Sequence, residues 1–206
     1  MSILPQVIRA NARRNRELLL AAAREAIAAH GTEASLRDIA RRAGVGIGTL
    51  YRHFPTREAL LEALLNDNFD TLRVRAEALL SSPAPGEALL TWLSEMAAGS
   101  ATYQGLPDSI MNALADEESG LHASCAQMRS AGGRLLDRAQ QAGSVRSDLT
   151  VLEVISLALG LAWAAERSVD PTDLVERLLS TAMYGLADRG QCGCGRETST
   201  APVHTA

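Results

Sequence analysis

The sequence has no lysine at all, and it has few aromatic residues, few cysteines and no long apolar run. Three cysteines in 206 residues exclude a small fold stapled by disulfides. No stretch of about 18 residues is free of charges and helix breakers, so we expect no transmembrane helix and no membrane partner. The first residues show no apolar core followed by a cleavage site, so no secretory signal is predicted and we expect a cytoplasmic protein.

The residue patterns typical of an enzyme or a metal site are also missing. There is no Gly-x-Ser-x-Gly elbow and no Ser–His–Asp signature. Cys192 and Cys194 are spaced C-x-C, and with His204 they offer only three ligands, so no metal site is predicted. The glycines within 44–48 suggest a phosphate loop, but such a loop follows a strand and we expect helices on both sides. We therefore predict no catalysis and no cofactor.

The basic residues are all arginines, and they are unevenly distributed along the chain. Residues 1–57 hold ten arginines against four acids, a net charge of +6. The remaining residues hold ten arginines against twenty acids, a net charge of −10. A basic segment in an otherwise acidic protein predicts a polyanionic partner for that segment alone.

Residues 35–57 (SLRDIARRAGVGIGTLYRHFPTR) show the pattern of two short helices joined by a turn. Ser35 suits a helix N-cap, and Gly44 supplies a left-handed turn position after the first helix. Each helix has one apolar stripe, formed by Leu36, Ile39, Ala40 and Ala43 in the first and by Val45, Leu50 and Phe54 in the second. One buried face per helix leaves an outer face free to enter a DNA major groove. We therefore predict a helix-turn-helix from Ser35 to Phe54.

The outer face of this unit carries groups suited to DNA. Thr49, Tyr51 and His53 offer polar tips to phosphates or base edges. Arg37 and Arg57 lie in the first turns of the preceding and following helices, where free backbone N–H groups also favour phosphate.

The rest of the chain is predicted to be helical, so the fold class is all-α. We expect a flexible arm over 1–13 and a three-helix head over 14–56. A helix over 57–80 is long enough to link two domains, and it leads into the break SSPAPG. Residues 57–190 form the second domain with this helix included, and the polar residues 191–206 are expected to be a disordered tail.

Residues 14–65 resemble the DNA-binding head of the TetR (tetracycline-repressor) family of bacterial regulators. The matching motifs are Ala29-His30-Gly31, Leu36-x-x-Ile39-Ala40-x-x-Ala43-Gly44-Val45, Gly48-Thr49-Leu50-Tyr51-x-His53-Phe54 and Arg57-Glu58-x-Leu60-Leu61. Two mild departures are Ile27, where the family usually has Phe, and Gly46, often Ser. The resemblance implies an all-helical homodimer with one DNA head per subunit, whose second domain binds a small molecule and forms the dimer interface.

Carried over by position, the resemblance implies DNA contacts from Arg37, Ile47, Gly48, Thr49, Tyr51, His53 and Arg57. Arg52 is variable in the family and is predicted to set sequence preference. We expect a sequence-specific DNA-binding regulator, a repressor released from a palindromic double-stranded operator by a small-molecule effector. A ligand-binding or scaffolding protein whose head has lost DNA binding is the alternative.

The second domain is predicted to hold the dimer interface and the effector. Helix 150–168 is apolar nearly all round, so one side can face its own domain and the other, with helix 171–189, a partner subunit. A monomeric core is the alternative. Adaptable apolar side chains are the candidates for the effector pocket: Trp92, Met96, Tyr103, Met111, Met128 and Trp163. Ordinary core is the alternative for each. No internal acid is evident, which favours a largely apolar effector.

Overall fold

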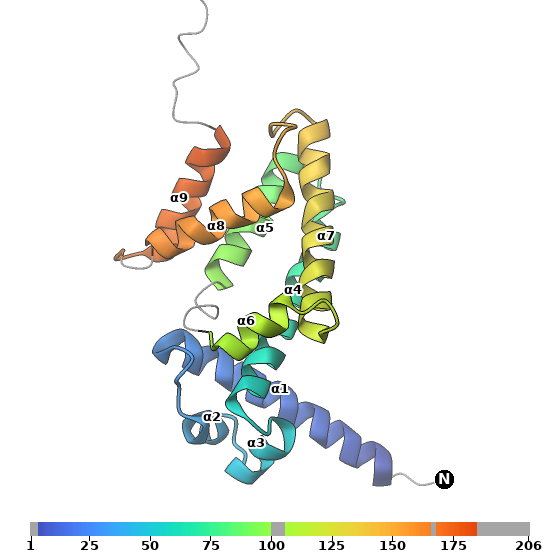
Figure 1. Ribbon diagram of the computed structural model, residues 1–206, viewed down its shortest axis with the longest axis vertical. Helices are drawn as coiled ribbons and strands as arrows, with labels where there is room; N and C mark the ends of the chain where they lie inside the picture. Colours follow the sequence, from blue (N-terminus) through green and yellow to red (C-terminus); the bar gives the residue numbers. More distant parts are fainter. Residues whose placement is uncertain (1–3, 100–105, 166–167, 185–206) are drawn as a thin grey trace, which may run out of the picture.

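The computed structural model describes residues 4–99, 106–165 and 168–184, and the regular structure of these residues is entirely helical (Figure 1). This confirms the predicted all-α class. The helices are α1 (Leu4–His30), α2 (Leu36–Arg42), α3 (Ile47–His53), α4 (Arg57–Leu79), α5 (Pro85–Ala98), α6 (Asp108–Ala115), α7 (Gly120–Gln141), α8 (Val151–Ala165) and α9 (Pro171–Tyr184). None of the helices in these ranges has both the length and the apolarity needed to cross a bilayer.

The helix ends of the head follow the local sequence signals. The Ser35 hydroxyl accepts a hydrogen bond from the Asp38 backbone N–H at the start of α2, and the Thr56 hydroxyl accepts one from Ala59 at the start of α4. Gly31 and Gly44 adopt positive φ angles of 73° and 69°, which other residues rarely adopt. These caps fix where each short helix begins and ends.

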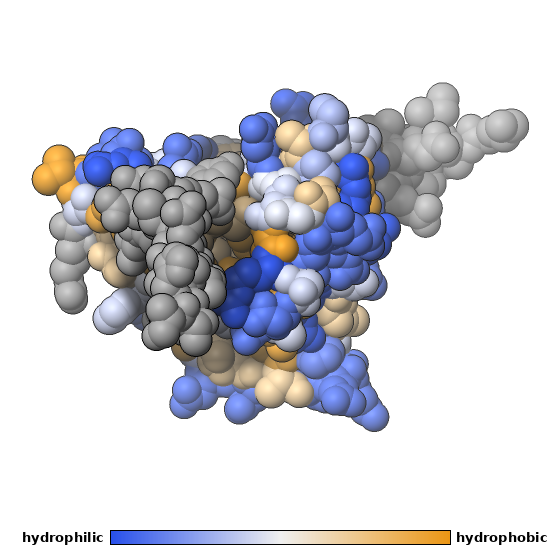
Figure 2. Space-filling model, turned by 90° about the horizontal axis from the view of Figure 1, so that it is seen from above, coloured by the Kyte–Doolittle hydropathy of each residue, from blue (hydrophilic) through white to orange (hydrophobic). Residues whose placement is uncertain are grey.

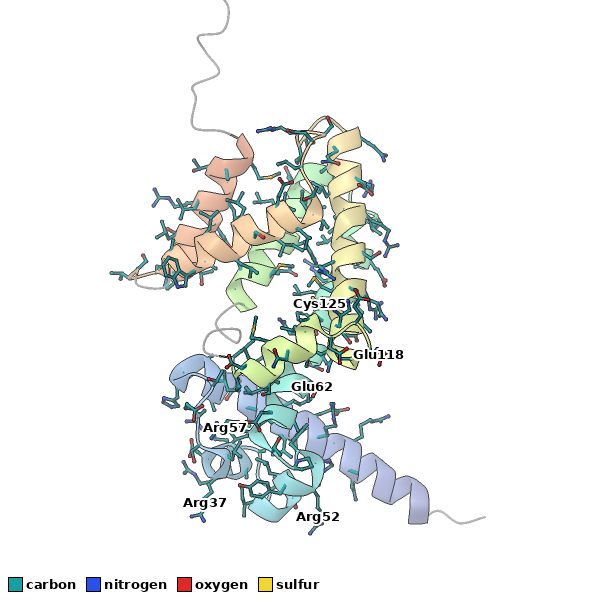
Figure 3. The ribbon with its side chains drawn as sticks, in the orientation of Figure 1. Arg37, Arg52, Arg57, Glu62, Glu118 and Cys125 are labelled. Carbon is teal, nitrogen blue, oxygen red and sulfur yellow. The ribbon has the colours of Figure 1, made fainter. Side chains whose placement is uncertain are left out.

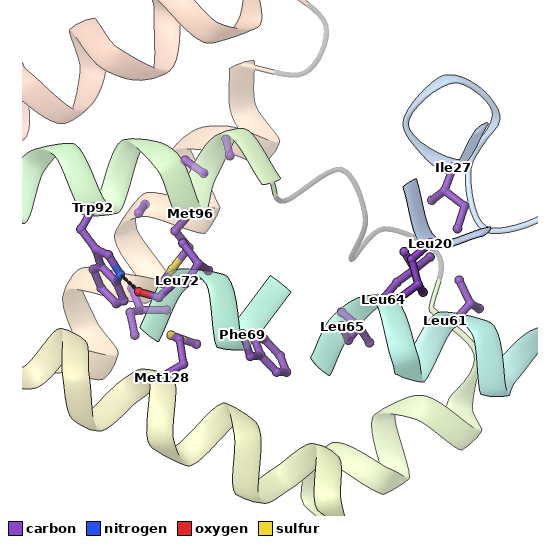
Figure 4. Close-up of a cluster of buried hydrophobic side chains, with 14 of the residues drawn as sticks. Leu20, Ile27, Leu61, Leu64, Leu65, Phe69, Leu72, Trp92, Met96 and Met128 are labelled. Atoms are coloured by element: carbon purple, nitrogen blue, oxygen red, sulfur yellow. Dashed lines mark hydrogen bonds between the residues drawn. The ribbon is translucent and has the colours of Figure 1, made fainter. Parts of the chain in front are cut away.

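Helix α4 runs through both parts of the molecule. Helices α1 to α3 form the head at one end, α5, α7, α8 and α9 form the other end, and α6 lies between the two, beside the head (Figure 1). The first turns of α4 bury Leu61, Leu64 and Leu65 near Leu20 and Ile27 of α1 (Figure 4). Further along, its apolar face continues into the core between α5 and α7 through Phe69, Leu72 and Ala76. The predicted linker helix therefore belongs to two cores.

The first helix is longer than the sequence pattern predicts. A flexible arm is expected over 1–13, but α1 begins at Leu4 and continues without a break to His30. Pro5 is tolerated here because a helix's first turn needs no backbone donor. The alanines and arginines that follow are good helix formers, and no glycine interrupts them before Gly31. The predicted tail, 191–206, lies outside the described residues.

Trp92 fills the centre of the second core. Its side chain is fully buried, and its indole N–H donates to the Leu72 carbonyl oxygen at 2.9 Å (Figure 4). The ring lies directly against the backbone of α7 at Gly132. A Cβ atom at Gly132 would lie 2.2 Å from the Cη2 atom of Trp92, a distance that real contacts do not allow. Gly132 is therefore required for α5 to approach α7 this closely.

Adding one methyl group at this contact should destabilise the protein. We expect Gly132→Ala to lower the free energy of unfolding by about 1–3 kcal/mol, because an overpacked core must shift. The neighbouring Gly133 is a matched control, since its added Cβ would meet only Val151 at 4.0 Å. Gly133→Ala should be neutral or stabilising by up to about 1 kcal/mol, as alanine favours helix. Urea unfolding of both variants checks this, and equal stabilities would contradict it.

Candidate nucleic-acid interface

The α2–turn–α3 unit is held together by a shared apolar core and a hydrogen-bonded turn. Ile39, Leu50 and Phe54 are almost completely buried. The Gly44 N–H donates to the Arg41 carbonyl oxygen and the Val45 N–H to that of Ala40, both within about 3.1 Å. This turn satisfies the last carbonyl groups of α2 and fixes the direction in which α3 leaves. The result is a helix-turn-helix with one face of α3 left outside, as predicted.

The outer face of α3 exposes large side chains. Tyr51 is 49% exposed and Ile47 36% exposed, and Arg52 and Gly48 also lie at the surface. Thr49 and His53 are half-buried at the edge of this face. No neighbouring atom lies within 4 Å of a Cβ built on Gly48. A slim helix with exposed aromatic, apolar and cationic groups has the shape and chemistry to enter a groove in DNA.

The arginines around this face are available to an anion. Arg37 and Arg52 point away from the body of the head (Figure 3). The single acid of α2, Asp38, is engaged by Arg41 and by Arg42, whose Nε lies 2.9 Å from its carboxylate. The hydrogen bond from Arg41, and then that from Arg42, lower the pKa of Asp38 below its usual value. Asp38 is thus neutralised within α2, while Arg37 has no acidic partner in the described parts of the chain.

Arg57, at the start of α4, makes hydrogen bonds inside the head. Its Nη1 atom donates to the carbonyl oxygens of Thr32 at 2.6 Å and Ala34 at 2.7 Å, and its side chain is half-buried. It therefore ties the start of α4 to the loop between α1 and α2 (Figure 3). The sequence analysis predicts a DNA contact for Arg57, and these hydrogen bonds, which use one nitrogen of the guanidinium, do not test it. They assign Arg57 a positioning role within the head.

The six candidates for the effector pocket are not brought together. Trp92, Met96 and Met128 lie in one buried cluster between α4, α5 and α7 (Figure 4). Met111 on α6 is 52% exposed and Trp163 on α8 is 70% exposed, so the prediction that these two line an internal pocket is wrong. Both lie on outward faces of helices, which a spacing argument could not distinguish from inward ones. Tyr103 lies outside the described residues.

Helix α8 carries an exposed face that the sequence signalled only through its overall apolarity. This face, here called the α8 stripe, consists of Leu152, Ser156, Leu157, Gly160, Trp163 and Ala164, all exposed, and Glu153 at its start is the one charged residue on it. On the opposite face α8 packs against α5, α7 and α9. Viewed from above, hydrophobic side chains reach the surface of this end of the molecule between hydrophilic ones (Figure 2). An apolar stripe of this kind is typical of a protein–protein contact.

The described residues contain no group of histidine, cysteine or acidic side chains placed to hold a metal ion. Cys192, Cys194 and His204 lie outside the described ranges. Burial raises the pKa of the Cys125 thiol, so this cysteine is a poor nucleophile.

The architecture and the exposed α3 face define a class: regulators that bind DNA through a helix-turn-helix carried on a second helical domain. Residues 19–64 match the family model for bacterial regulatory proteins of the tetR family. Residues 84–188 match the model for the C-terminal domain of SbtR-like transcriptional regulators. The chain therefore belongs to the TetR family of bacterial transcriptional regulators, which are not enzymes.

Relatives and solved structures agree with this family. The chain is 31% identical over 168 residues to the HTH-type transcriptional repressor KstR2 of Rhodococcus jostii, covering 74% of this chain and 81% of that protein. It is 30% identical over 186 residues to the repressor KstR of the same organism, covering 86% of each. The crystal structure of the TetR transcriptional regulator SCO0520 from Streptomyces coelicolor has a TM-score of 0.67 and 36% identity, covering 83% of this chain and 97% of that one.

The positioning role of Arg57 makes a prediction with two readouts. Arg57→Ala should destabilise the head by about 3 kcal/mol, since hydrogen bonds from a charged group contribute about 1.5–3 kcal/mol each. Arg57→Lys should recover only part of this loss, because an ammonium cannot reproduce the guanidinium geometry. Thermal unfolding measures the first readout. The salt dependence of DNA binding measures the second, and it should not change. A slope shallower by about 0.9 per subunit would mean that Arg57 contacts a phosphate after all.

Proposed function

We propose that this protein is a dimeric transcriptional repressor that binds a palindromic operator and leaves it when a small-molecule effector binds. The observation that carries the proposal is the exposed face of α3 with Ile47, Tyr51 and Arg52, together with the exposed Arg37 of the neighbouring α2, on the only basic part of the sequence. Its relatives KstR and KstR2 of Rhodococcus jostii are named as repressors.

In this proposal α3 enters the major groove and reads the operator. Gly48, Thr49 and Tyr51 approach phosphates and base edges from the first turns of the helix, and His53 does so from its end. Arg52 is exposed and free of an acidic partner in the described residues, so it can bind a guanine through two hydrogen bonds. Such a pair contributes about 1–3 kcal/mol of discrimination against other bases.

Two heads act together through α8 and α9. The α8 stripe places Leu157 and Trp163 in solvent, and covering them against a second copy removes this apolar surface from water. No neighbouring atom lies within 4 Å of a Cβ built on Gly160, so a partner helix can approach α8 closely there. A two-fold axis at this face gives a four-helix interface and presents two α3 helices to half-sites about one or more DNA turns apart.

The effector is proposed to enter the core between α4, α5 and α7, near Trp92, Met96 and Met128. Among the described residues, the buried polar side chain is Thr32, which lies in the head, so this core offers an apolar lining. Two structural neighbours, each 24% identical to this chain, are named with ring-containing molecules: the ketosteroid transcriptional regulator KstR2 of Mycobacterium tuberculosis, and LfrR of Mycobacterium smegmatis in complex with proflavine. A largely apolar, ring-containing molecule fits the same lining.

Effector binding can change the orientation of the head through a movement of α4. A molecule wedged beside Trp92 must displace α4 at Leu72, whose carbonyl accepts the Trp92 indole N–H. The other end of the same helix holds the α1–α2 loop through Arg57. Tilting α4 therefore changes the head orientation, and repression is relieved if the effector binds the tilted state more tightly.

DNA binding and dimerisation can be tested as separate functions. We expect Tyr51→Ala with His53→Ala to abolish the mobility shift of DNA from the region upstream of the protein's own gene. Sedimentation should still show a dimer, because both side chains lie far from the α8 stripe. Leu157→Glu with Trp163→Glu should give a folded monomer with much weaker DNA binding. An unchanged shift for the first variant would disprove the α3 assignment, and an unchanged dimer for the second would disprove the interface.

Native mass spectrometry tests the effector. We expect the protein to retain, or take up from a panel of sterol-like and planar aromatic compounds, a small apolar molecule that weakens the mobility shift. Trp92→Phe with Met128→Leu should alter the affinity for that molecule by reshaping its lining. If compounds of the panel bind to the protein but leave its affinity for DNA unchanged, binding in this core does not regulate DNA binding, and the proposal is contradicted.

A further inference from the structure

The N-terminal half of α1 extends beyond the core of the head. Among the side chains of α1 that the structure describes, from Ala10 onward, the first buried one is Leu19, and those from Ala10 to Leu18 are exposed except for the half-buried Asn15. This part of α1 projects past the head, and its N-terminal end reaches the level of α3 along the long axis of the molecule (Figure 1). A helical segment with so few described core contacts is only marginally stable in water. A contact outside the head would therefore stabilise this segment as a helix.

The charges of this extension indicate what it contacts. Residues 4–18 contain four arginines and one acid, Glu17, and the first turn has no acidic residue. Arg13 and Arg16 are three positions apart on one side of the helix, where like charges repel. Glu17 offsets this repulsion only through an exposed ion pair with Arg13, in which the Arg13 Nε and Glu17 Oε1 atoms are 3.6 Å apart. Arg14 is exposed, with no acidic partner in the described residues. Such a helix is suited to an extended polyanion rather than to a protein core.

Arg16 fixes the extension relative to the recognition helix. Its guanidinium carbon lies 5.7 Å from the centre of the Phe54 ring, directly after the end of α3. Arg13, Arg16 and Arg24 also line a surface cleft of about 390 Å³ between α1 and α4, where Arg24 is paired with Asp67 at 2.5 Å. Arg13, which has only the exposed contact with Glu17, and Arg14 are the remaining exposed arginines of the extension whose side chains the structure describes.

We propose that the N-terminal half of α1 is a second DNA-contacting element, which binds backbone phosphates flanking the part of the operator read by α3. This inference rests on the proposed DNA-binding function. At about 1.5 Å per residue, Leu4 lies about 18 Å beyond Arg16, a length of roughly five base pairs at 3.4 Å each. The contacts are to phosphates, so they add affinity without adding sequence preference.

The number of phosphate contacts can be measured from the salt dependence of DNA binding, because the slope of log K against log salt is proportional to it. The test uses Arg13→Ala with Arg14→Ala in the full-length protein and a mixed-sequence duplex of about 50 base pairs, several helical turns long. Fluorescence anisotropy gives the affinity between about 50 and 200 mM salt. Four arginines are removed per dimer, so the slope of log K against log salt should become shallower by up to about 3.6. Alanine favours helix and both sites are exposed, so circular dichroism and thermal unfolding should match the wild type.

Two further variants separate the contact from other effects. Arg13→Lys with Arg14→Lys keeps the charge and should keep most of the slope. Arg134→Ala with Arg146→Ala removes the same charge from the second domain, at two exposed sites, and should leave the slope unchanged. The proposal stands if the α1 alanine variant loses about two or more in slope while both controls do not. A smaller loss, with the wild type binding DNA, overturns this inference alone. Failure of the wild type to bind any duplex overturns the proposed function with it.

Discussion

Helix α4 buries one continuous apolar face against two different cores, and the other helices are arranged around it. Its first turns pack with α1 in the head, and its later turns pack with α5 and α7 around Trp92. Close-packed interiors resist gradual deformation, so a displacement at one end of a stiff helix must appear at the other. The contact between the Trp92 indole and the Leu72 carbonyl, and the contact of Arg57 with the α1–α2 loop, mark the two ends of this connection.

Arginine performs two kinds of work in a protein without lysine. In and around α4, Arg24, Arg73 and Arg75 pair with acids, and Arg138 donates to the carbonyl oxygens of Leu80 and Ser82 at the end of α4. In the head, Arg14, Arg37 and Arg52 are exposed and have no acidic partner among the described residues. The fork of a guanidinium serves both uses, because it matches carbonyl pairs, carboxylates and phosphates equally well. The net charge of each part then determines which arginines remain for DNA.

The elements of the head could be predicted closely, since each depends on local signals. Ser35, Gly44 and Thr56 set helix ends through their own backbone and hydroxyl hydrogen bonds. The start of α1 was harder to predict, because Pro5 and the basic Arg9 and Arg13 favoured an arm, although Leu4, Val7 and Ile8 recur at helical spacing. The pocket candidates were hardest. Trp92 and Trp163 have the same side chain, yet one is fully buried and the other 70% exposed. Only the direction in which each helix packs distinguishes them.

The sequence by itself determined the all-helical class, the helix-turn-helix and the sign of its charge, because caps, glycine turns, apolar periodicity and composition act over a few neighbouring residues. The tertiary structure decided the rest. It showed that Arg57 ties α4 to the α1–α2 loop, since Thr32 and Ala34 approach it only in the folded head. It also placed Leu157 and Trp163 on an outer face and Met96 on an inner one. Such outcomes depend on which distant segments meet, and spacing along the chain does not specify that.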